Sequence, residues 1–299
     1  MQRQNSLTCL KKLNSLAEIR NTPVYIVGGT VRDLLLGRDI TDLDMVVFGD
    51  VWRLAADLAR AFETSWFIVD EPNQTARVIL PDHQAPKHLD LIGSGYQNLQ
   101  ENLLDRDFTV NSMAIRLLDY LNFTEGRNGE LIGKIIDPAQ GLADLPRKIL
   151  RLTRTSAFEK DALRLLRAVR LSATLGFDLA SETRTLIKEQ AGLLALVKSE
   201  RIRDELFKIL AVERAYPWIL LLDELALLAQ VFPELTPLKG VEQNEHHALD
   251  VWGHSLAALE EFELQPWEGL FSPERKAAVE DFLSEDLAAG RQRRQILKR

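Results

Sequence analysis

The sequence predicts a mixed α/β domain followed by a remainder made of helices, and three observations support this fold class. Short apolar segments with strand character recur up to about residue 116 of the 299-residue chain. Two glycines follow the first of these segments and lead into a helix. From about residue 140 onward strand character nearly vanishes, and apolar residues recur at the spacing of an α-helix.

The elements are expected in a definite order. A short amphipathic helix over 6–20 precedes the first strand, and helices at 31–37 and 51–62 lie between strands. The strand candidates share an apolar or alternating pattern and cover 24–27, 43–48, 66–69, 76–80 and 88–92. The later segments, which share the helical period, cover 142–152, 160–175, 181–196, 199–213 and 217–230.

Composition argues against several classes of protein. No apolar run reaches the roughly 18 residues that a membrane-spanning helix needs, and the first residues carry no apolar signal core. Cys9 is the only cysteine, so neither an internal disulfide nor a thiolate zinc site can form. We therefore expect a cytoplasmic protein that does not enter a membrane.

The net charge of −7 disfavours indiscriminate binding to nucleic acid, but the charge is unevenly distributed. The segment 147–170 contains eight basic and two acidic residues. Such a run is usually a solvated helix face, and beside a nucleotide site it could instead bind the phosphates of a polynucleotide.

The strongest local signal is the segment Gly28-Gly29-Thr30-Val31-Arg32-Asp33 after the first strand candidate. Glycines at such a corner allow backbone N–H groups to approach a ligand, and the following helix N-terminus favours negative charge. Arg32 lies in the first turn, where a guanidinium can bind phosphate oxygens in pairs. Read alone, the two glycines would indicate only a turn.

Asp42 and Asp44 follow within a few residues, and on a strand their side chains share one face. Two adjacent carboxylates repel each other unless a cation lies between them, and Mg²⁺ bound to nucleotide phosphates supplies that cation. A phosphate-binding corner followed closely by paired carboxylates predicts nucleotidyl transfer. On its own, an Asp-x-Asp pair could equally be a solvated strand or a helix cap.

In combination, Gly-Gly-x-Val-Arg-Asp-x-Leu-Leu-Gly and Asp-x-Asp resemble the head domain of class II tRNA nucleotidyltransferases and bacterial poly(A) polymerases. These proteins belong to the polymerase-β-like nucleotidyltransferase superfamily. The resemblance implies an α/β nucleotidyltransferase head (a small mixed sheet with flanking helices) followed by an all-helical neck and body. We expect the head at 1–140, the neck at 141–215 and a body at 216–299 that is a truncated HD-like remnant.

The resemblance implies roles for further residues of the head. Gly28, Gly29 and Arg32 would bind the nucleotide, while Asp42 and Asp44 would hold two Mg²⁺ ions. Asp90 would be a third metal ligand or a base for the attacking hydroxyl, unless it is simply a solvent-facing carboxylate.

The stretch Asp105-Arg106-Asp107-Phe108-Thr109-Val110-Asn111-Ser112 is similar to a second family motif, Arg-Arg-Asp-Phe-Thr-x-Asn-Ala. Asp105 and Ser112 depart from the motif. The match implies that Arg106, Asp107 and Asn111 bind the nucleotide, with Asp107 accepting a hydrogen bond from a ribose hydroxyl. Asp107 would also make a good N-cap for a following helix.

Two further segments carry the resemblance. Asp137-Pro138-Ala139-Gln140-Gly141-Leu142-Ala143-Asp144-Leu145 matches the family pattern, except that Gln140 replaces one glycine. The stretch 160–170 resembles Glu-Asp-x-x-Arg-x-x-Arg-Ala, with Lys160 in place of Glu. In this motif Asp161 and Arg164, three residues apart on one helix face, would read cytosine and adenine, and Arg167 and Arg170 would continue toward the phosphates. A surface ion pair is the alternative role for Asp161 and Arg164.

The resemblance implies a tRNA nucleotidyltransferase that adds C and/or A to the tRNA 3′ end from CTP and/or ATP. CCA addition, CC addition and A addition all remain open. The first alternative is a bacterial poly(A) polymerase, and the alternative from another class is a non-catalytic RNA-binding protein. Restoring the family residue with Lys160→Glu is expected to be tolerated. Histidines 246, 247 and 254 resemble the opening of an HD-type domain, where we expect packing or remnant roles and no metal site.

Overall fold

The computed structural model describes residues 2–38, 40, 43–80, 88–126, 130–242 and 249–264, with side chains from residue 7 onward. The chain forms two compact units, and the boundary between them in the sequence lies between Pro233 and Glu234.

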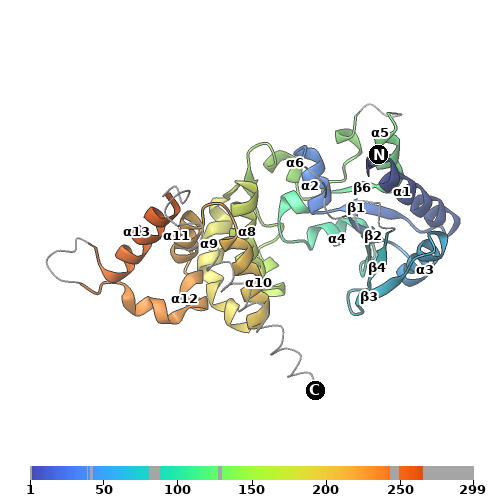
Figure 1. Ribbon diagram of the computed structural model, residues 1–299. Coiled ribbons are helices and arrows are strands. Elements are labelled where there is room, and N and C mark those ends of the chain that lie inside the picture. The colour runs from blue at the N-terminus through green and yellow to red at the C-terminus, as the bar shows by residue number, and fades with distance from the viewer. Residues whose placement is uncertain are drawn as a thin grey trace, which may run out of the picture. The chain divides into compact units, whose positions relative to one another are not determined.

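The first unit begins with a six-stranded sheet in the order β3-β4-β5-β2-β1-β6 (Figure 1). The β2–β5 pair is parallel, and the other pairs are antiparallel, so the expected small mixed sheet is confirmed. The strands are β1 (Val24–Val27), β2 (Asp44–Val47), β3 (Trp66–Asp70), β4 (Thr75–Ile79), β5 (His88–Gly93) and β6 (Ala114–Arg116). Of these six strands, only β6 was not predicted as a strand from the sequence.

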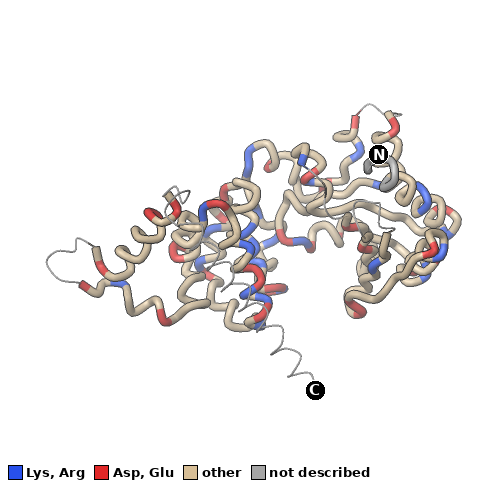
Figure 2. Tube along the Cα trace, viewed as in Figure 1, with Lys and Arg blue, Asp and Glu red and all other residues tan. Residues whose placement is uncertain are grey.

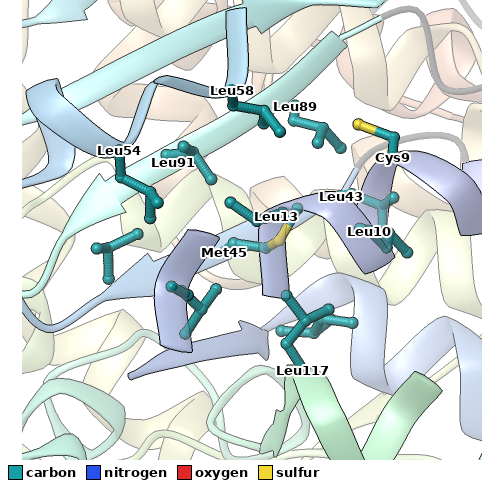
Figure 3. Packing of buried hydrophobic residues seen from close by; sticks show 14 of the residues in the cluster. Cys9, Leu10, Leu13, Leu43, Met45, Leu54, Leu58, Leu89, Leu91 and Leu117 are labelled. Atoms are coloured by element: carbon teal, nitrogen blue, oxygen red, sulfur yellow. The ribbon is translucent and has the colours of Figure 1, made fainter. Parts of the chain in front are cut away.

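One face of the sheet is covered by α1 (Gln2–Ile19), α3 (Val51–Ala61) and α5 (Leu117–Thr124). Their apolar side chains form one buried cluster with the inward residues of the strands (Figure 3). Cys9 lies in this cluster, and burial raises the pKa of its thiol to about 12. The other face buries Val27 and Val46 against Leu103 of α4 (Leu99–Leu104). Alternation along each strand thus supplies both layers of the core.

The glycine corner leads into α2 (Gly29–Leu35), as predicted. A 3₁₀ turn, η1 (Thr109–Asn111), follows α4, and a second one, η2 (Ile132–Lys134), precedes the rest of the unit. The helices α4 and α5 were not predicted. Each is short, and the apolar residues in them are too few to define a period.

The remainder of the first unit is mainly helical, but two of its predicted helices were wrong in detail. In place of a helix over 142–152, α6 (Gly141–Asp144) is followed by β7 (Ile149–Leu150), which pairs in parallel with β8 (Asp178–Leu179). Lys148 has a φ of 55°, which ends helical geometry before β7. The predicted helix 160–175 is divided into α7 (Ala157–Lys160) and α8 (Arg164–Leu175).

The later predicted segments are helical, but the predicted helix 217–230 is divided into two helices at Ala226, which has a φ of 58°. The later helices are α9 (Ser181–Gln190) with η3 (Ala191–Leu196), α10 (Ser199–Leu210), α11 (Tyr216–Glu224) and α12 (Leu227–Val231). Gly176, with a φ of 69°, ends α8 in the left-handed conformation that glycine adopts readily.

In the second unit, η4 (Pro233–Leu238) begins at the boundary and α13 (Val251–Leu264) is the main helix. Asp250 accepts hydrogen bonds from the backbone N–H groups of Gly240 and Gly253, which fixes the start of α13. His254 lies on α13, while histidines 246 and 247 are outside the described residues. Within the described part of the chain, no helix combines the length and the apolar character required to cross a membrane.

Candidate nucleotide-binding site

A cavity of about 340 Å³ opens beside the start of α2 in the first unit. It collects residues from four separate stretches of sequence, and most of the predicted nucleotide-binding residues are among them. Its lining consists of Gly29, Thr30, Arg32, Asp33, Ile40, Asp44, Arg106, Asp107, Asn111, Arg167, Arg170 and Leu171. The cavity is therefore bordered by four arginines and three aspartates.

Glycine is required at the corner for two reasons. Gly28 has φ 70° and ψ −135°, a conformation that residues with a side chain rarely adopt. A Cβ atom at Gly28 would also lie 2.6 Å from Nη1 of Arg106. The first glycine thus lets the Arg106 guanidinium approach the backbone, and Gly29 begins α2 at the cavity wall.

Arg32 is buried and held in a fixed orientation. Its Nε and Nη2 atoms donate to the two carboxylate oxygens of Asp33 at 2.9 and 2.8 Å. Its Nη1 atom donates to Oδ1 of Asn111 at 2.6 Å. Asp33 was quoted in the motif but given no role from sequence; its place beside Arg32 in the chain was the available signal.

Arg106 has the least satisfied guanidinium of the site. Its Nε atom is buried and has no hydrogen-bond partner among the described residues. Desolvation lowers the pKa of Arg106, although the nearby carboxylates of Asp107 and Asp44 oppose this effect. A buried cationic donor without an acceptor is costly, and an anionic ligand in the cavity would supply the missing acceptor.

Asp107 is buried, and its carboxylate accepts four hydrogen bonds. Oδ1 accepts from the backbone N–H of Phe108 and from Nδ2 of Asn111, at 2.8 and 3.0 Å. Oδ2 accepts from Nε and Nη2 of Arg167. Burial raises the pKa of Asp107, but the Arg167 charge and these hydrogen bonds outweigh burial and lower it on balance.

The two roles expected for Asp107 have to be revised. The four donors occupy the lone-pair sites that a carboxylate offers, so in this structure none is left for a ribose hydroxyl. Asp107 is not an N-cap either, because Phe108 occupies the cap position of η1 and no side chain caps it. Asp107 instead orients Arg167 and Asn111 at the cavity.

Two of the predicted catalytic carboxylates, Asp44 and Asp90, lie opposite each other on the β2–β5 pair. Asp44 lines the cavity, and its backbone N–H donates to Oγ1 of Thr30 at 3.3 Å. Asp90 is its register partner on β5, and both oxygens of Asp90 accept from Arg77, at 2.7 and 2.6 Å. Asp42 lies outside the described residues. Carboxylate oxygens are suitable ligands for Mg²⁺, and Asp44 presents them where the arginines would attract phosphates.

Asp161 and Arg164 are arranged differently from the prediction. Asp161 is not helical; its φ of −148° and ψ of 101° place it in extended backbone before α8. Its Oδ1 accepts from the backbone N–H of Leu163, and its Oδ2 accepts from Arg201 at 3.0 Å. Arg164 donates to the carbonyl oxygens of Ala157 and Asp105. The two residues therefore do not share a helix face, and neither lines the cavity.

Arg167 and Arg170 do extend along α8 into the cavity, as predicted. The buried carboxylate of Glu205 on α10 accepts from Nε of Arg170 at 2.6 Å. From the other side, Arg38 donates to the carbonyl oxygens of Thr174 and Leu175, where α8 ends. The Glu205 contact joins α8 to α10, and the Arg38 contacts join the end of α8 to the sheet-bearing part of the same unit.

The segment 137–145 also has a structural explanation. Both oxygens of Asp137 accept from backbone N–H groups, those of Gly141 and Leu142, and so begin α6. A Cβ atom at Gly141 would collide with the carbonyl oxygen of Thr109. Asp144 is buried and accepts from the Thr109 hydroxyl at 2.8 Å. The segment therefore supports η1, which carries Asn111 at the cavity.

Comparison with known proteins places these features in a family. Residues 24–151 match the poly A polymerase head domain, and residues 176–239 match the probable RNA and SrmB-binding site of polymerase A. The fold and the site thus define a nucleotidyltransferase head, followed in the sequence by a segment that matches the RNA-binding family model. The chain belongs to the family of tRNA nucleotidyltransferases and poly(A) polymerases.

Individual relatives have related names. The CC-adding tRNA nucleotidyltransferase of Geobacter sulfurreducens is 36% identical over 206 residues, which are 69% of this chain and 44% of that protein. The A-adding tRNA nucleotidyltransferase of Deinococcus radiodurans is 35% identical over 239 residues, 78% of this chain and 50% of that protein. The chain spans about half the length of these curated relatives.

A solved structure described as a CCA-adding enzyme with CTP superimposes with a TM-score of 0.66 and 28% identity, over 92% of this chain and 64% of that one. A tRNA nucleotidyltransferase complexed with a primer tRNA and an incoming ATP analog has a TM-score of 0.62 and 30% identity, over 78% of this chain and 64% of that one. Nucleotidyltransferases of this kind generally use divalent metal ions.

Proposed function

We propose that this chain carries the catalytic part of a tRNA nucleotidyltransferase that adds C and/or A to the tRNA 3′ end without a nucleic-acid template. The observation that carries the proposal is the cavity at α2. There Arg106, whose buried Nε atom has no hydrogen-bond partner in the described part of the chain, lines the same wall as Asp44. An anionic, metal-bound triphosphate satisfies both groups at once. The names of the relatives support tRNA as the acceptor.

In the proposed reaction the 3′-hydroxyl of the tRNA attacks the α-phosphorus of CTP or ATP, and pyrophosphate leaves. Gly28 and Gly29 leave space for the phosphates, and Arg32 and Arg106 bind their oxygens. Asp42 and Asp44 would hold two Mg²⁺ ions, whose chemistry when bound is to neutralise phosphate charge and activate the hydroxyl. Asp90, oriented by Arg77, would be a third carboxylate beside this pair.

We further propose three parts for the chain: the head at 1–140, the neck at 141–215 and the helical body at 216–299. The extended Asp161 and the neighbouring Arg164 lie at the start of α8, outside the cavity wall. In the proposal they contact the base of the incoming nucleotide, Asp161 after giving up part of its present hydrogen bonds and Arg164 with its carbonyl contacts kept. Asp161 would accept from the amino group that cytosine and adenine share, and Arg164 would donate to the adjacent ring nitrogen.

The test incubates the 299-residue protein with tRNAs that end before CCA, after C, after CC and after complete CCA. Each tRNA receives CTP or ATP separately with Mg²⁺, and product lengths are read on a gel. Extension by one or two C identifies CC addition, extension of the CC-ending tRNA by one A identifies A addition, and both together identify CCA addition. Long A tails on complete tRNA would instead indicate a poly(A) polymerase, and tRNA binding without extension would indicate a non-catalytic RNA-binding protein.

A further inference from the structure

Two residues that depart from the family motifs contact each other. Lys160 Nζ lies 2.5 Å from Oδ2 of Asp105, although the two residues are 55 positions apart. Asp105 directly follows α4, and Lys160 is the last residue of α7. The ion pair therefore connects the sheet-bearing region with the segment that leads into α8.

The two departures are opposite in sign. The motif that Asp105 interrupts begins with arginine, and the motif that Lys160 interrupts begins with glutamate. A negative charge has replaced a positive one at the first position, and the reverse has happened at the second. Either change alone would place like charges next to each other, whereas both together keep one charge of each sign. We therefore treat the two departures as a single exchange.

Tyr96 strengthens the pair. Its hydroxyl donates to Oδ2 of Asp105 and lies 3.1 Å from Lys160 Nζ, and the same Nζ atom is 5.6 Å from the centre of the Tyr96 ring. The Asp105 side chain is only 20% exposed, so solvent screens this pair less than a surface pair. Partial burial raises the pKa of Asp105, but the Lys160 and Tyr96 hydrogen bonds lower it on balance.

Asp105 also contacts Arg164, through its backbone. Nη2 of Arg164 donates to the Asp105 carbonyl oxygen at 2.9 Å, and Nη1 donates to the Ala157 carbonyl oxygen at 3.3 Å. Ala157 begins α7, and Lys160 ends it. The two carbonyl groups that hold the Arg164 guanidinium thus belong to the two segments that the Asp105–Lys160 pair joins.

We propose that Asp105 and Lys160 form a charge-exchanged pair that positions Arg164 for selection of the nucleotide base. The proposal rests on the proposed function, in which Arg164 contacts the base. It also changes one expectation from sequence. Lys160→Glu would place a second carboxylate against Asp105, so restoring the family residue at this position alone is harmful.

The experiment uses five variants of the 299-residue chain: Asp105→Arg, Lys160→Glu, the double variant with both changes, Lys160→Met and Lys188→Glu. Lys188 is the matched control, because its Nζ atom lies 3.3 Å from Oε1 of Glu224 and its side chain is 45% exposed, against 53% for Lys160. Lys188→Glu therefore places like charges together at a comparable surface position away from Arg164. Lys160→Met removes the charge without repulsion and serves if Lys160→Glu does not fold.

Equilibrium binding of ATP, CTP and GTP is measured with Mg²⁺, together with thermal unfolding. We expect each single change in the pair to reduce the preference for ATP and CTP over GTP by about fivefold or more, and the double variant to regain it to within about twofold. Lys160→Met should lose part of the preference. Lys188→Glu should keep the wild-type preference.

The proposal would be overturned if the double variant preferred ATP and CTP over GTP no more strongly than the single variant with the lower preference. A wild-type preference in Lys160→Glu would also overturn it. A wild-type protein that binds the three nucleotides equally would also overturn it. Nucleotide binding does not require transfer to tRNA, so the binding measurement tests the positioning pair and the extension assay tests the proposed function. If wild type extends no tRNA but the charge exchange restores nucleotide preference, the proposed function falls and the positioning pair stands.

Discussion

Arg167 donates two hydrogen bonds to the same oxygen of Asp107, from Nε at 3.0 Å and from Nη2 at 2.6 Å. The two residues are 60 positions apart, and the Asp107 side chain is only 6% exposed. The pair therefore fastens α8 to the loop before η1 at the cavity wall.

Arg167→Met should destabilise the first unit, because it leaves a buried carboxylate without its cationic partner. A loss of about 1–3 kcal/mol in the free energy of unfolding is expected near neutral pH. Arg203→Met is the control, since the one ion pair of Arg203 among the described residues is with the adjacent, exposed Asp204, and it should change stability by less than about 0.5 kcal/mol. Urea unfolding of both variants measures the difference.

The same pair predicts a pH dependence. The pKa of Asp107 is below its ordinary value of 3.8 in the folded protein, so the pair's contribution is fully present above that value. The contribution is lost as the pH falls from 3.8 toward the lowered pKa. The difference in stability between wild type and Arg167→Met should therefore shrink below pH 3.8. A difference that does not shrink as the pH falls below 3.8 would show that Asp107 does not carry the effect.

Gly28→Ala should abolish or strongly reduce nucleotide binding, because its Cβ atom would displace the Arg106 guanidinium from the cavity. Gly37→Ala is a matched control. Gly37 has a similar φ of 67°, but nothing lies within 4 Å of the position that its Cβ atom would take. Both substitutions should cost stability, by about 1 kcal/mol for the control. If titration with ATP shows equal losses of affinity in both variants, backbone strain rather than the Arg106 contact is responsible.

Asp44→Asn should lower nucleotide incorporation by at least about 100-fold without unfolding the protein, because it removes a metal ligand and relieves carboxylate repulsion. Asp42→Asn should behave in the same way. Asp178→Asn provides the control, since Asp178 is an exposed aspartate at the start of β8. Activity is measured across a range of Mg²⁺ concentrations, with thermal unfolding alongside. Near-normal incorporation in Asp44→Asn would refute the metal assignment.

RNA binding should depend on only part of the basic segment 147–170. Figure 2 shows acidic residues interleaved with basic ones over the helices α8 to α10. Most of the basic side chains already form hydrogen bonds or ion pairs within the protein. Arg151 pairs with Asp144 and Glu182, and the other residues with such contacts are Lys160, Arg164, Arg167 and Arg170. Arg147, Lys148 and Arg154 are exposed and form no ion pair with a described residue. We expect these three to bind RNA phosphates.

Replacing these three residues with Ala should therefore weaken tRNA binding and reduce the slope of log affinity against log salt by about 2, at about 0.7 per phosphate contact. A control that removes Lys12, Arg53 and Lys134, which are exposed on α1, α3 and η2, changes the net charge equally. An equal loss of slope in the control would mean that net charge, rather than this segment, governs tRNA binding.

Much of the head could be predicted because its signals are local. The strand at 24–27 was predicted to the residue, and α2 and α3 began or ended within two residues of the prediction. An apolar run, a glycine pair and a helical period are each contained in one short segment, so no distant partner is needed to recognise them. The local pattern gave a wrong prediction where a distant segment decides the structure. Ile149 and Leu150 fit the predicted helix 142–152, but they form a strand that pairs with β8.

The sequence determined the fold class, because its apolar patterns are local. The resemblance of its motifs to a known family grouped Gly29, Arg32, Asp44, Arg106 and Asn111 as one candidate site. The tertiary structure alone decided which charges meet. It pairs Asp161 with Arg201, fills the carboxylate of Asp107 with Arg167 and Asn111, and sets Lys160 against Asp105. Any of the many opposite charges in the chain could satisfy a given side chain, so only the packing of α8 against α10 and against the segment that carries Asp105 and Asp107 selects its partner.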